Sequence, residues 1–344
     1  MAIVPAGQKL VLDPADEYCH EPESAQNYNE SMYFNVFDAD QKIGGWMRLG
    51  NRVHEGHAEM SVCLYLPDGR VGFAYARPRI EHNREMNAGG LRIEVVEPFR
   101  RLRVHYEGPV LLLKNPLEMA EPSCAFKNNP LEACLVDLDY EGVSPMYGGR
   151  AVHEDGSDIE LDSEKSFARA HYEQHMKATG TIEVAGHEWT VAGLGLRDKS
   201  WGPRYWQAIH WYRWLPMSFT SDFGMMISVI AGEDGRIRRS GMVLRDGQYA
   251  AIRDARVESV WDRHGYQTSV RAWARTDERE YTVEGRVISM IPLRNRRKRP
   301  DGGQMLTRIT EGMTEYRCDG KIGYGLSEYL DQIVDGQPVG RDAV

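Results

Sequence analysis

Cysteine is scarce in this sequence, which has only five cysteines among 344 residues: Cys19, Cys63, Cys124, Cys134 and Cys318. They are scattered, odd in number and without Cys-x-x-Cys spacing, which argues against a disulfide framework or a structural zinc site and fits a reducing compartment. No apolar run approaches the roughly 20 residues of a membrane span, and the N-terminus lacks the charged start and apolar core of a signal peptide. We therefore expect a cytoplasmic protein without integral membrane association.

Positive charge is also in short supply, since the net charge is −9. The one basic run, residues 294–299, precedes the turn-like residues Pro300-Asp301-Gly302-Gly303. We interpret it as a solvated loop tip between two strands. Without a larger basic face, an acidic surface repels nucleic acid, so we expect no nucleic-acid partner.

Familiar catalytic and metal signatures are missing. The sequence has no Gly-x-Ser-x-Gly elbow, and no cysteine has a local histidine signature, so covalent hydrolysis is disfavoured. The glycines of Gly193-Leu194-Gly195 lack the third glycine and the lysine of a phosphate loop. His54 and His57 form a lone His-x-x-His in a predicted loop, which is a poor metal ligand set, and we expect no metal.

What is present is short apolar alternation broken by turn dipeptides, as in residues 31–37, 58–66 and 224–231. With 42% hydrophobic residues and this length, the pattern predicts an all-β protein of two tandem lipocalin-like antiparallel β-barrels or sandwiches packed together. Eight such strands close a barrel wide enough for one small ligand. The predicted divisions are an N-terminal extension (1–27), an N-terminal β domain (28–178), a C-terminal β domain (179–332) and a C-terminal tail (333–344). Residues 161–179 fit either a helix or a strand.

The densest chemistry lies in residues 193–219, which hold four of the eight tryptophans. Clustered aromatics offer an apolar wall whose N–H and O–H groups orient a ligand. The predicted wall residues are Trp201, Trp206, Trp211, Tyr212 and Trp214. Their alternative is a mixed role, part core and part pocket wall.

Titratable residues stand among these aromatics, and the predicted catalytic candidates here are Arg197, Asp198, Arg204 and His210. A carboxylate between cations stays ionised, whereas one facing an apolar wall holds its proton and acts as an acid. A histidine among tryptophans suits acid–base work or a hydrogen-bonded place in the core. For Asp198 and Arg204 the structural alternative is an ion pair that pins a loop.

Three carboxylates outside this segment are further candidates. Strand alternation places Glu30 on the face of Met32 and Phe34, inside the protein, where a carboxylate costs several kcal/mol unless it is paired or functional. Glu328 shares a face with Leu326 and Leu330 in the same way. We predict Glu30 as a catalytic residue and, as ligand-binding residues, Tyr33, Glu173 and Glu328. His171 is expected to be exposed to solvent.

The run Gly193 to Arg204 resembles the motif of the AttH and carotenoid 1,2-hydratase (hydroxyneurosporene synthase) superfamily, whose members carry Asp-His-Glu-Trp-Gly or Asp-His-Ser-Trp-Gly. The bacterial branch of uncharacterised relatives is similar in three further places: residues 29–34, 171–174 and 323–329. The resemblance spans residues 16 to 332 and implies two calycin-type barrels and cofactor-free chemistry on apolar chains. Lys199 and Ser200 stand where the hydratase motif has His-Glu, which removes one carboxylate.

Two functions follow. The first is a cofactor-independent acid–base enzyme, a hydratase or dehydratase, isomerase or cyclase, acting on a hydrophobic small molecule such as a terpenoid, steroid or polycyclic aromatic compound. The second is a non-catalytic carrier for a lipid-like ligand, whose pocket carboxylates would all be paired to arginines. Both functions are compatible with a homodimer.

Overall fold

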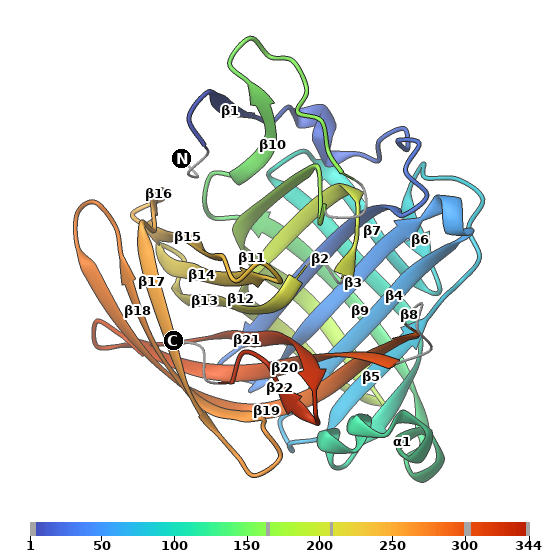
Figure 1. Ribbon diagram of the computed structural model, residues 1–344. Coiled ribbons are helices and arrows are strands. Elements are labelled where there is room, and N and C mark those ends of the chain that lie inside the picture. Colours follow the sequence, from blue (N-terminus) through green and yellow to red (C-terminus); the bar gives the residue numbers. More distant parts are fainter. Residues whose placement is uncertain (1–4, 163–165, 207–208, 299–303, 342–344) are drawn as a thin grey trace.

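The computed structural model describes residues 5–162, 166–206, 209–298 and 304–341 as two large antiparallel sheets, which confirms the all-β prediction (Figure 1). The first sheet comprises β1 (Gln8–Val11), β2 (Tyr28–Asp38), β3 (Ile43–Arg52), β4 (His57–Tyr65), β5 (Val71–Ala76), β6 (Met86–Ala88), β7 (Leu91–Glu97), β8 (Arg101–Leu113), β9 (Leu131–Gly142), β10 (Tyr147–His153), β11 (Ala170–Val184) and β12 (His187–Pro203). The second comprises β13 (Ile209–Thr220), β14 (Phe223–Gly232), β15 (Ile237–Arg245), β16 (Gln248–Ala251), β17 (Asp254–Trp261), β18 (Gln267–Arg275), β19 (Glu280–Lys298), β20 (Gln304–Cys318), β21 (Lys321–Val334) and β22 (Gln337–Pro338). The short helices are η1 (Pro14–Glu17), η2 (Val53–Glu55), η3 (Pro116–Ala120) and α1 (Pro122–Asn128).

The first sheet closes on itself. β9 pairs with β8 on one side and with β11 on the other, which completes the ring β2-β3-β4-β5-β8-β9-β11-β12. We call these eight strands the first barrel. The second sheet runs in the order β16-β15-β14-β13-β21-β20-β19-β18-β17 and curves around its own apolar core.

The chain changes sheet later than the sequence suggests. The predicted boundary at residue 178 falls inside β11, which pairs with β9 and β12 in the first barrel. The second sheet begins only at β13, after Pro203. Residues 170–184 are thus a strand and not a helix, and this strand is needed to close the first barrel.

β2 explains how the two sheets pack. All eleven of its residues are buried, because both faces of the strand are covered. Met32, Phe34 and Val36 point into the first barrel. Tyr33 and Phe37 point outward, into a layer that also contains residues of the second sheet, namely Ile291, Met313 and Leu326. Figure 1 shows β19–β21 crossing the blue strands of the first barrel at this layer.

The N-terminal segment is held to the first barrel by a buried ion pair. Arg197 Nη1 and Nη2 of β12 lie 2.6 and 2.8 Å from the two carboxylate oxygens of Glu17 in η1. The Tyr172 hydroxyl donates a third hydrogen bond to the same carboxylate at 2.8 Å. Burial alone would raise the pKa of Glu17, but the Arg197 charge and these hydrogen bonds outweigh it and hold the pKa below its usual value. The pair therefore fixes residues 14–17 against the barrel.

The basic run lies differently from the prediction. β19 extends to Lys298, so residues 294–298 belong to a strand and not to a loop tip, because they pair with β20. Arg294 donates two hydrogen bonds to the Glu121 carboxylate, at 2.6 and 2.9 Å. The predicted turn at 300–303 lies outside the described residues. In the part of the chain that the structure describes, no helix is long and apolar enough to cross a membrane.

The Glu17 ion pair makes a testable contribution to stability. We expect Arg197→Met to lower the free energy of unfolding by about 3–5 kcal/mol, because it leaves the Glu17 carboxylate buried without a cation. Urea denaturation measures this loss. The control Arg103→Met breaks the exposed pair with Asp139 and should leave the midpoint nearly unchanged. The double variant Glu17→Leu/Arg197→Met should recover part of the loss. A wild-type midpoint for Arg197→Met would refute the assignment.

Candidate active site between the two sheets

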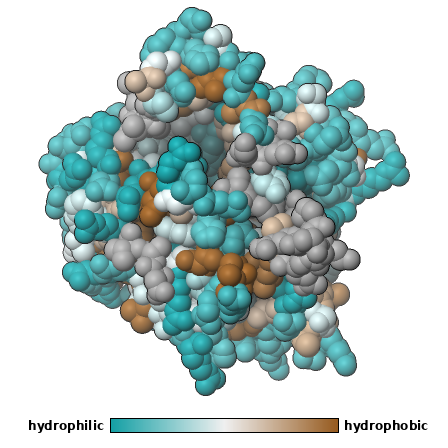
Figure 2. Space-filling model, in the orientation of Figure 1, coloured by the Kyte–Doolittle hydropathy of each residue, from teal (hydrophilic) through white to brown (hydrophobic). Residues whose placement is uncertain are grey.

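A cavity of about 950 Å³ lies between the outer wall of the first barrel and the second sheet. Strands β2–β5, β11 and β12 line it on one side, and β13, β14 and β19–β21 line it on the other. Its apolar wall includes Tyr33, Trp46, Phe167, Trp206, Tyr212 and Trp214. The face seen in Figure 2 is mostly hydrophilic with small apolar patches. The volume is that of a site for a drug-sized molecule.

One group of titratable residues projects into the cavity from the first barrel. Glu173 of β11 and Asp198 of β12 are directly opposite in the strand register, and His171 lies two residues before Glu173 on the same face. His171 Nε2 is 3.3 Å from Asp198 Oδ2 and 3.8 Å from Glu173 Oε1. From the second sheet, the Trp214 indole N–H donates a hydrogen bond to Glu173 Oε1 at 2.9 Å.

The surroundings shift both pKa values upward. Burial raises the pKa of Glu173 to about 7, and the neighbouring Asp198 charge adds to this. For His171, burial disfavours the imidazolium, but the hydrogen bond to Asp198 and the charges of Asp198 and Glu173 outweigh it and raise the pKa. The cluster therefore combines a carboxyl that titrates near neutral pH with a histidine whose charged form is favoured by the two neighbouring carboxylates.

A second acidic pair comes from the second sheet. Glu311 of β20 and Glu328 of β21 are opposite in register and hydrogen-bonded to each other. The Tyr212 hydroxyl donates to Glu328 Oε1. Burial, together with the repulsion between the two carboxyls, raises the pKa of Glu311 well above its usual range, and burial raises that of Glu328 to about 7. Two carboxyls this close retain a proton between them at neutral pH.

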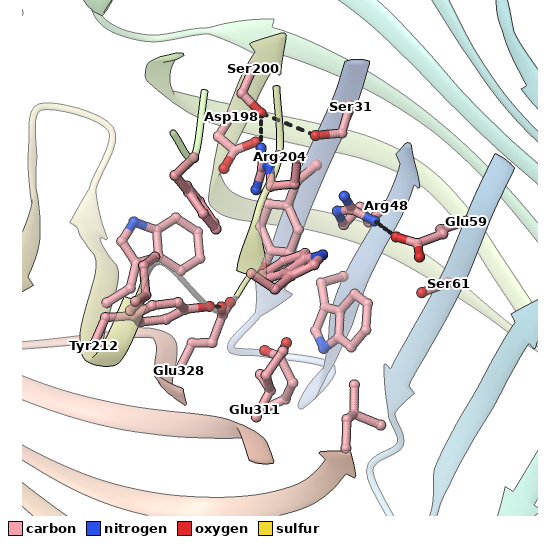
Figure 3. Close-up of a pocket in the computed structure, with 18 of the residues that line it drawn as sticks. Ser31, Arg48, Glu59, Ser61, Asp198, Ser200, Arg204, Tyr212, Glu311 and Glu328 are labelled. Carbon is pink, nitrogen blue, oxygen red and sulfur yellow. Dashed lines mark hydrogen bonds and ion pairs between the residues drawn. The ribbon is translucent and has the colours of Figure 1, made fainter. Parts of the chain in front are cut away.

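Two arginines complete the polar lining, and Figure 3 shows both at the cavity (Figure 3). Arg204 Nη2 donates a hydrogen bond to Ser200 Oγ at 2.6 Å, and Ser200 Oγ lies 3.1 Å from Ser31 Oγ. Arg48 Nη1 is 3.6 Å from Glu59 Oε2. In the view of Figure 3 these groups lie above the aromatic rings, with Glu311 and Glu328 below them.

The cavity brings together eight of the thirteen residues predicted from the sequence. They are Tyr33, Glu173, Asp198, Arg204, Trp206, Tyr212, Trp214 and Glu328. Among described residues, no ion pair joins Asp198 to Arg204, so the loop-pinning alternative does not describe them. Glu328 shares its face with Leu326 and Leu330, as strand alternation predicts.

The other five lie elsewhere. Glu30 is inside the first barrel, as predicted, but Lys199 Nζ lies 2.9 Å from its carboxylate. Burial opposes ionisation of Glu30, yet hydrogen bonds from His20 and the Lys199 charge lower its pKa to about 2. Arg197 is committed to Glu17. These pairs give Glu30 and Arg197 structural partners away from the cavity.

The aromatic segment also divides between core and cavity. Trp201 stacks on His20, with ring centroids 4.0 Å apart, on the side of β12 that faces away from the cavity. Trp211 belongs to the core of the second sheet. His210 is half-buried on β13 and is not among the described residues that line the cavity. The tryptophans therefore have the mixed role that the sequence leaves open.

Sequence reasoning missed His171, Glu311, Arg48 and Trp46. The side chain of His171 is 46% exposed, as expected, but it also lines the cavity, which the sequence does not indicate. Its position two residues before Glu173 in an alternating strand could have identified it. The role of Glu311 depends on its pairing with Glu328 across the β20–β21 hairpin. Counting residues back from the turn at residues 319–320 would have placed the two carboxyls opposite each other.

His171, Glu173 and Asp198 are also close enough to suggest a metal site, since their ligand atoms lie within 4.8 Å of one another. A metal requires neutral histidine and ionised carboxylates. The raised pKa values of His171 and Glu173 oppose this state, and Trp214 already occupies one Glu173 oxygen. A metal bound here would have to displace these protons. His54 and His57 do not belong to the cluster.

Three solved structures share this architecture. The AttH-like protein NE1406 of Nitrosomonas europaea has a TM-score of 0.62 and 12% identity, with 96% of this chain and 98% of that chain covered. Kievitone hydratase of Nectria haematococca has a TM-score of 0.57 and 9% identity, covering 94% and 93%. CghA with Sch210972 has a TM-score of 0.53 and 12% identity, covering 94% and 96%.

These likenesses confirm the predicted resemblance in fold to the AttH and carotenoid hydratase group. No curated protein matches the chain in sequence. The sequence does match one family over residues 13–333, almost the whole of the two sheets. The chain belongs to the family described as "Domain of unknown function (DUF7064)".

Proposed function

We propose that this protein is a cofactor-independent acid–base enzyme that adds, removes or shifts a proton on a hydrophobic small molecule, as a hydratase or dehydratase, an isomerase or a cyclase. The observation that carries the proposal is the His171–Glu173–Asp198 cluster on the wall of an aromatic cavity. A buried carboxyl with a pKa of about 7 is matched to proton transfer near neutral pH. Kievitone hydratase, by its name a hydratase, has the same fold.

The charge pattern favours an enzyme over a carrier. A carrier would gain by pairing each buried carboxylate with an arginine, since an unpaired one costs several kcal/mol. Among described residues, Glu173, Glu311 and Glu328 have no arginine within ion-pair distance, and burial raises the pKa of each carboxyl instead. An enzyme that transfers protons needs carboxylic acids without a cationic partner in its cavity. A carrier that only holds its ligand has no use for them.

The proposed roles follow from position. Glu173 or the His171 imidazolium donates a proton to a double bond or an oxygen of the substrate, and the resulting base later recovers a proton from water or from the substrate. Asp198 orients His171 and stabilises its charged form. The rings of Trp206, Trp214 and Tyr212 face the same space and stabilise a developing cation through their π faces.

Alternate residues of the hydratase-like motif point to opposite faces of β12. In β12, Asp198 and Ser200 line the cavity, whereas Lys199 turns to Glu30 on the other face. Ser200 occupies the place of the motif's glutamate, so this chain lacks a carboxylate at that cavity position. Glu173, directly across from Asp198, supplies a carboxyl from the neighbouring strand.

The raised pKa of Glu173 predicts a pH effect on stability. Between its usual value of 4.5 and about 7, the folded protein holds a proton that the unfolded chain has lost. This group alone should therefore lower the free energy of unfolding by roughly 1.4 kcal/mol per pH unit as pH rises through that window. Glu173→Gln should flatten the decline, as measured by urea denaturation at pH 5, 6 and 7. Parallel wild-type and variant profiles would contradict the assignment.

The activity itself is tested on whatever the purified protein carries. Native mass spectrometry and organic extraction identify the bound compound, which is then incubated with the protein in D₂O. We expect the wild type to incorporate deuterium or to change the compound's mass by one water. Glu173→Gln and Asp198→Asn should slow this by about 10²- to 10⁴-fold, the usual contribution of one acid–base group.

The matched control is Glu141→Gln, whose carboxylate pairs with Lys177 on the outside of the barrel and should leave the rate unchanged. A compound returned unchanged by the wild type, with no deuterium, would mean a carrier. Equal rates for Glu173→Gln, Asp198→Asn and Glu141→Gln would show that the cluster is not the catalytic group.

A further inference from the structure

We propose that Arg204 and Arg48 form a binding site for the carboxylate of the substrate, so that the ligand is a hydrophobic acid held by its head group. This inference rests on the proposed function, because it assumes that the aromatic cavity is the substrate site. It adds the chemical class of the substrate and the direction in which it enters the cavity.

Arg204 is the main observation. Only 7% of this residue is exposed. Among described residues its guanidinium makes one hydrogen bond, from Nη2 to Ser200 Oγ, and the buried Nε has no partner. No carboxylate lies within ion-pair distance of it in the described part of the chain. Burial, reinforced by the nearby Arg48 charge, lowers the pKa of Arg204 to about 9, and the Asp198 charge, which lies beyond ion-pair distance, offsets this only in part. A buried cation without an anion is costly, and an anionic ligand removes that cost.

Arg48 contributes a second guanidinium to this end of the cavity. Its Nη1 contacts Glu59 at 3.6 Å, whereas the buried Nη2 has no partner. The guanidinium carbons of Arg48 and Arg204 lie 5.9 and 5.3 Å from the centre of the same Trp206 ring. Both side chains line the cavity, and Figure 3 shows them on the same side of it.

The chemistry of these groups selects a carboxylate on an apolar molecule. Planar guanidinium forks match the two oxygens of a carboxylate. The hydroxyls of Ser31 and Ser200 lie beside Arg204 and offer further hydrogen bonds. Beyond this polar end, the lining is aromatic and suits a hydrocarbon body rather than a free inorganic ion. Seating the head group here extends the rest of the ligand past the aromatic rings toward Glu311 and Glu328, with Asp198 close to the head group.

Dodecanoate and dodecanol are suitable probes because they share one chain and differ in the head group. Isothermal titration calorimetry of the full-length protein should give at least tenfold tighter binding of dodecanoate. Arg204→Gln should weaken dodecanoate about 10- to 100-fold, the range for a lost hydrogen-bonded charge, and leave dodecanol unchanged. Arg204→Lys should weaken it less, because the charge remains and the fork is lost. Arg48→Gln, at the edge of the same site, should also weaken dodecanoate.

The control is Arg103→Gln, an exposed arginine on the outer face of the barrel, which should bind both probes as the wild type does. Equal binding of acid and alcohol, insensitive to Arg204→Gln and Arg48→Gln, would overturn the carboxylate site and leave the acid–base proposal standing. Inorganic sulfate bound as tightly as dodecanoate, with the same dependence on Arg204, would show a free-anion site and also overturn it. Binding of neither probe would overturn it as well, while the pH profile of Glu173→Gln tests the acid cluster independently.

Discussion

The site depends on one packing constraint, namely that the outer wall of the first barrel is buried beneath the second sheet. A closed barrel ordinarily has an apolar inside and a wetted outside. Here β2 is buried on both faces, with Met32 and Phe34 inside and Tyr33 turned toward the second sheet. Strand alternation then sends consecutive residues to two different buried spaces. In β12 it separates Arg197 and Lys199, which find carboxylate partners away from the cavity, from Asp198 and Ser200, which line it.

This constraint explains which parts of the site were predictable. Alternation within a strand is local, so the sequence correctly placed Glu30 on the face of Met32 and Phe34, and Glu328 on that of Leu326 and Leu330. It does not say which face meets the ligand, because that depends on how the sheets close and pack. Both of these carboxylates are buried, but only Glu328 lines the cavity.

The features that the sequence did not predict depend on contacts between residues that are far apart in the chain. The predicted boundary at residue 178 lies within β11, which belongs to the first barrel through pairing with β9, some forty residues earlier in the chain. Arg197 is a predicted catalytic residue, but it pairs with Glu17, which lies 180 positions earlier in the chain. The residues missed altogether, His171 and Glu311, gain their chemistry from neighbours on other strands, Asp198 and Glu328. The aromatic cluster correctly indicated the region of the sequence that lines the cavity, but it did not indicate which of its residues line the cavity and which belong to the core.

The electrostatics of the cavity argue for a purpose beyond folding. Elsewhere the fold pairs its buried charges, as with Glu17 and Arg197, Glu30 and Lys199, and Arg213 and Asp331. In the described wall of the cavity, Glu173 stands opposite Asp198 and Glu311 opposite Glu328, and Arg204 has no carboxylate within ion-pair distance. Each such group costs stability that an apolar side chain would not. Since the same chain satisfies buried charges so consistently outside the cavity, the unpaired groups inside it are best explained by a ligand. That ligand would supply the missing anion to the arginines and exchange protons with the acids.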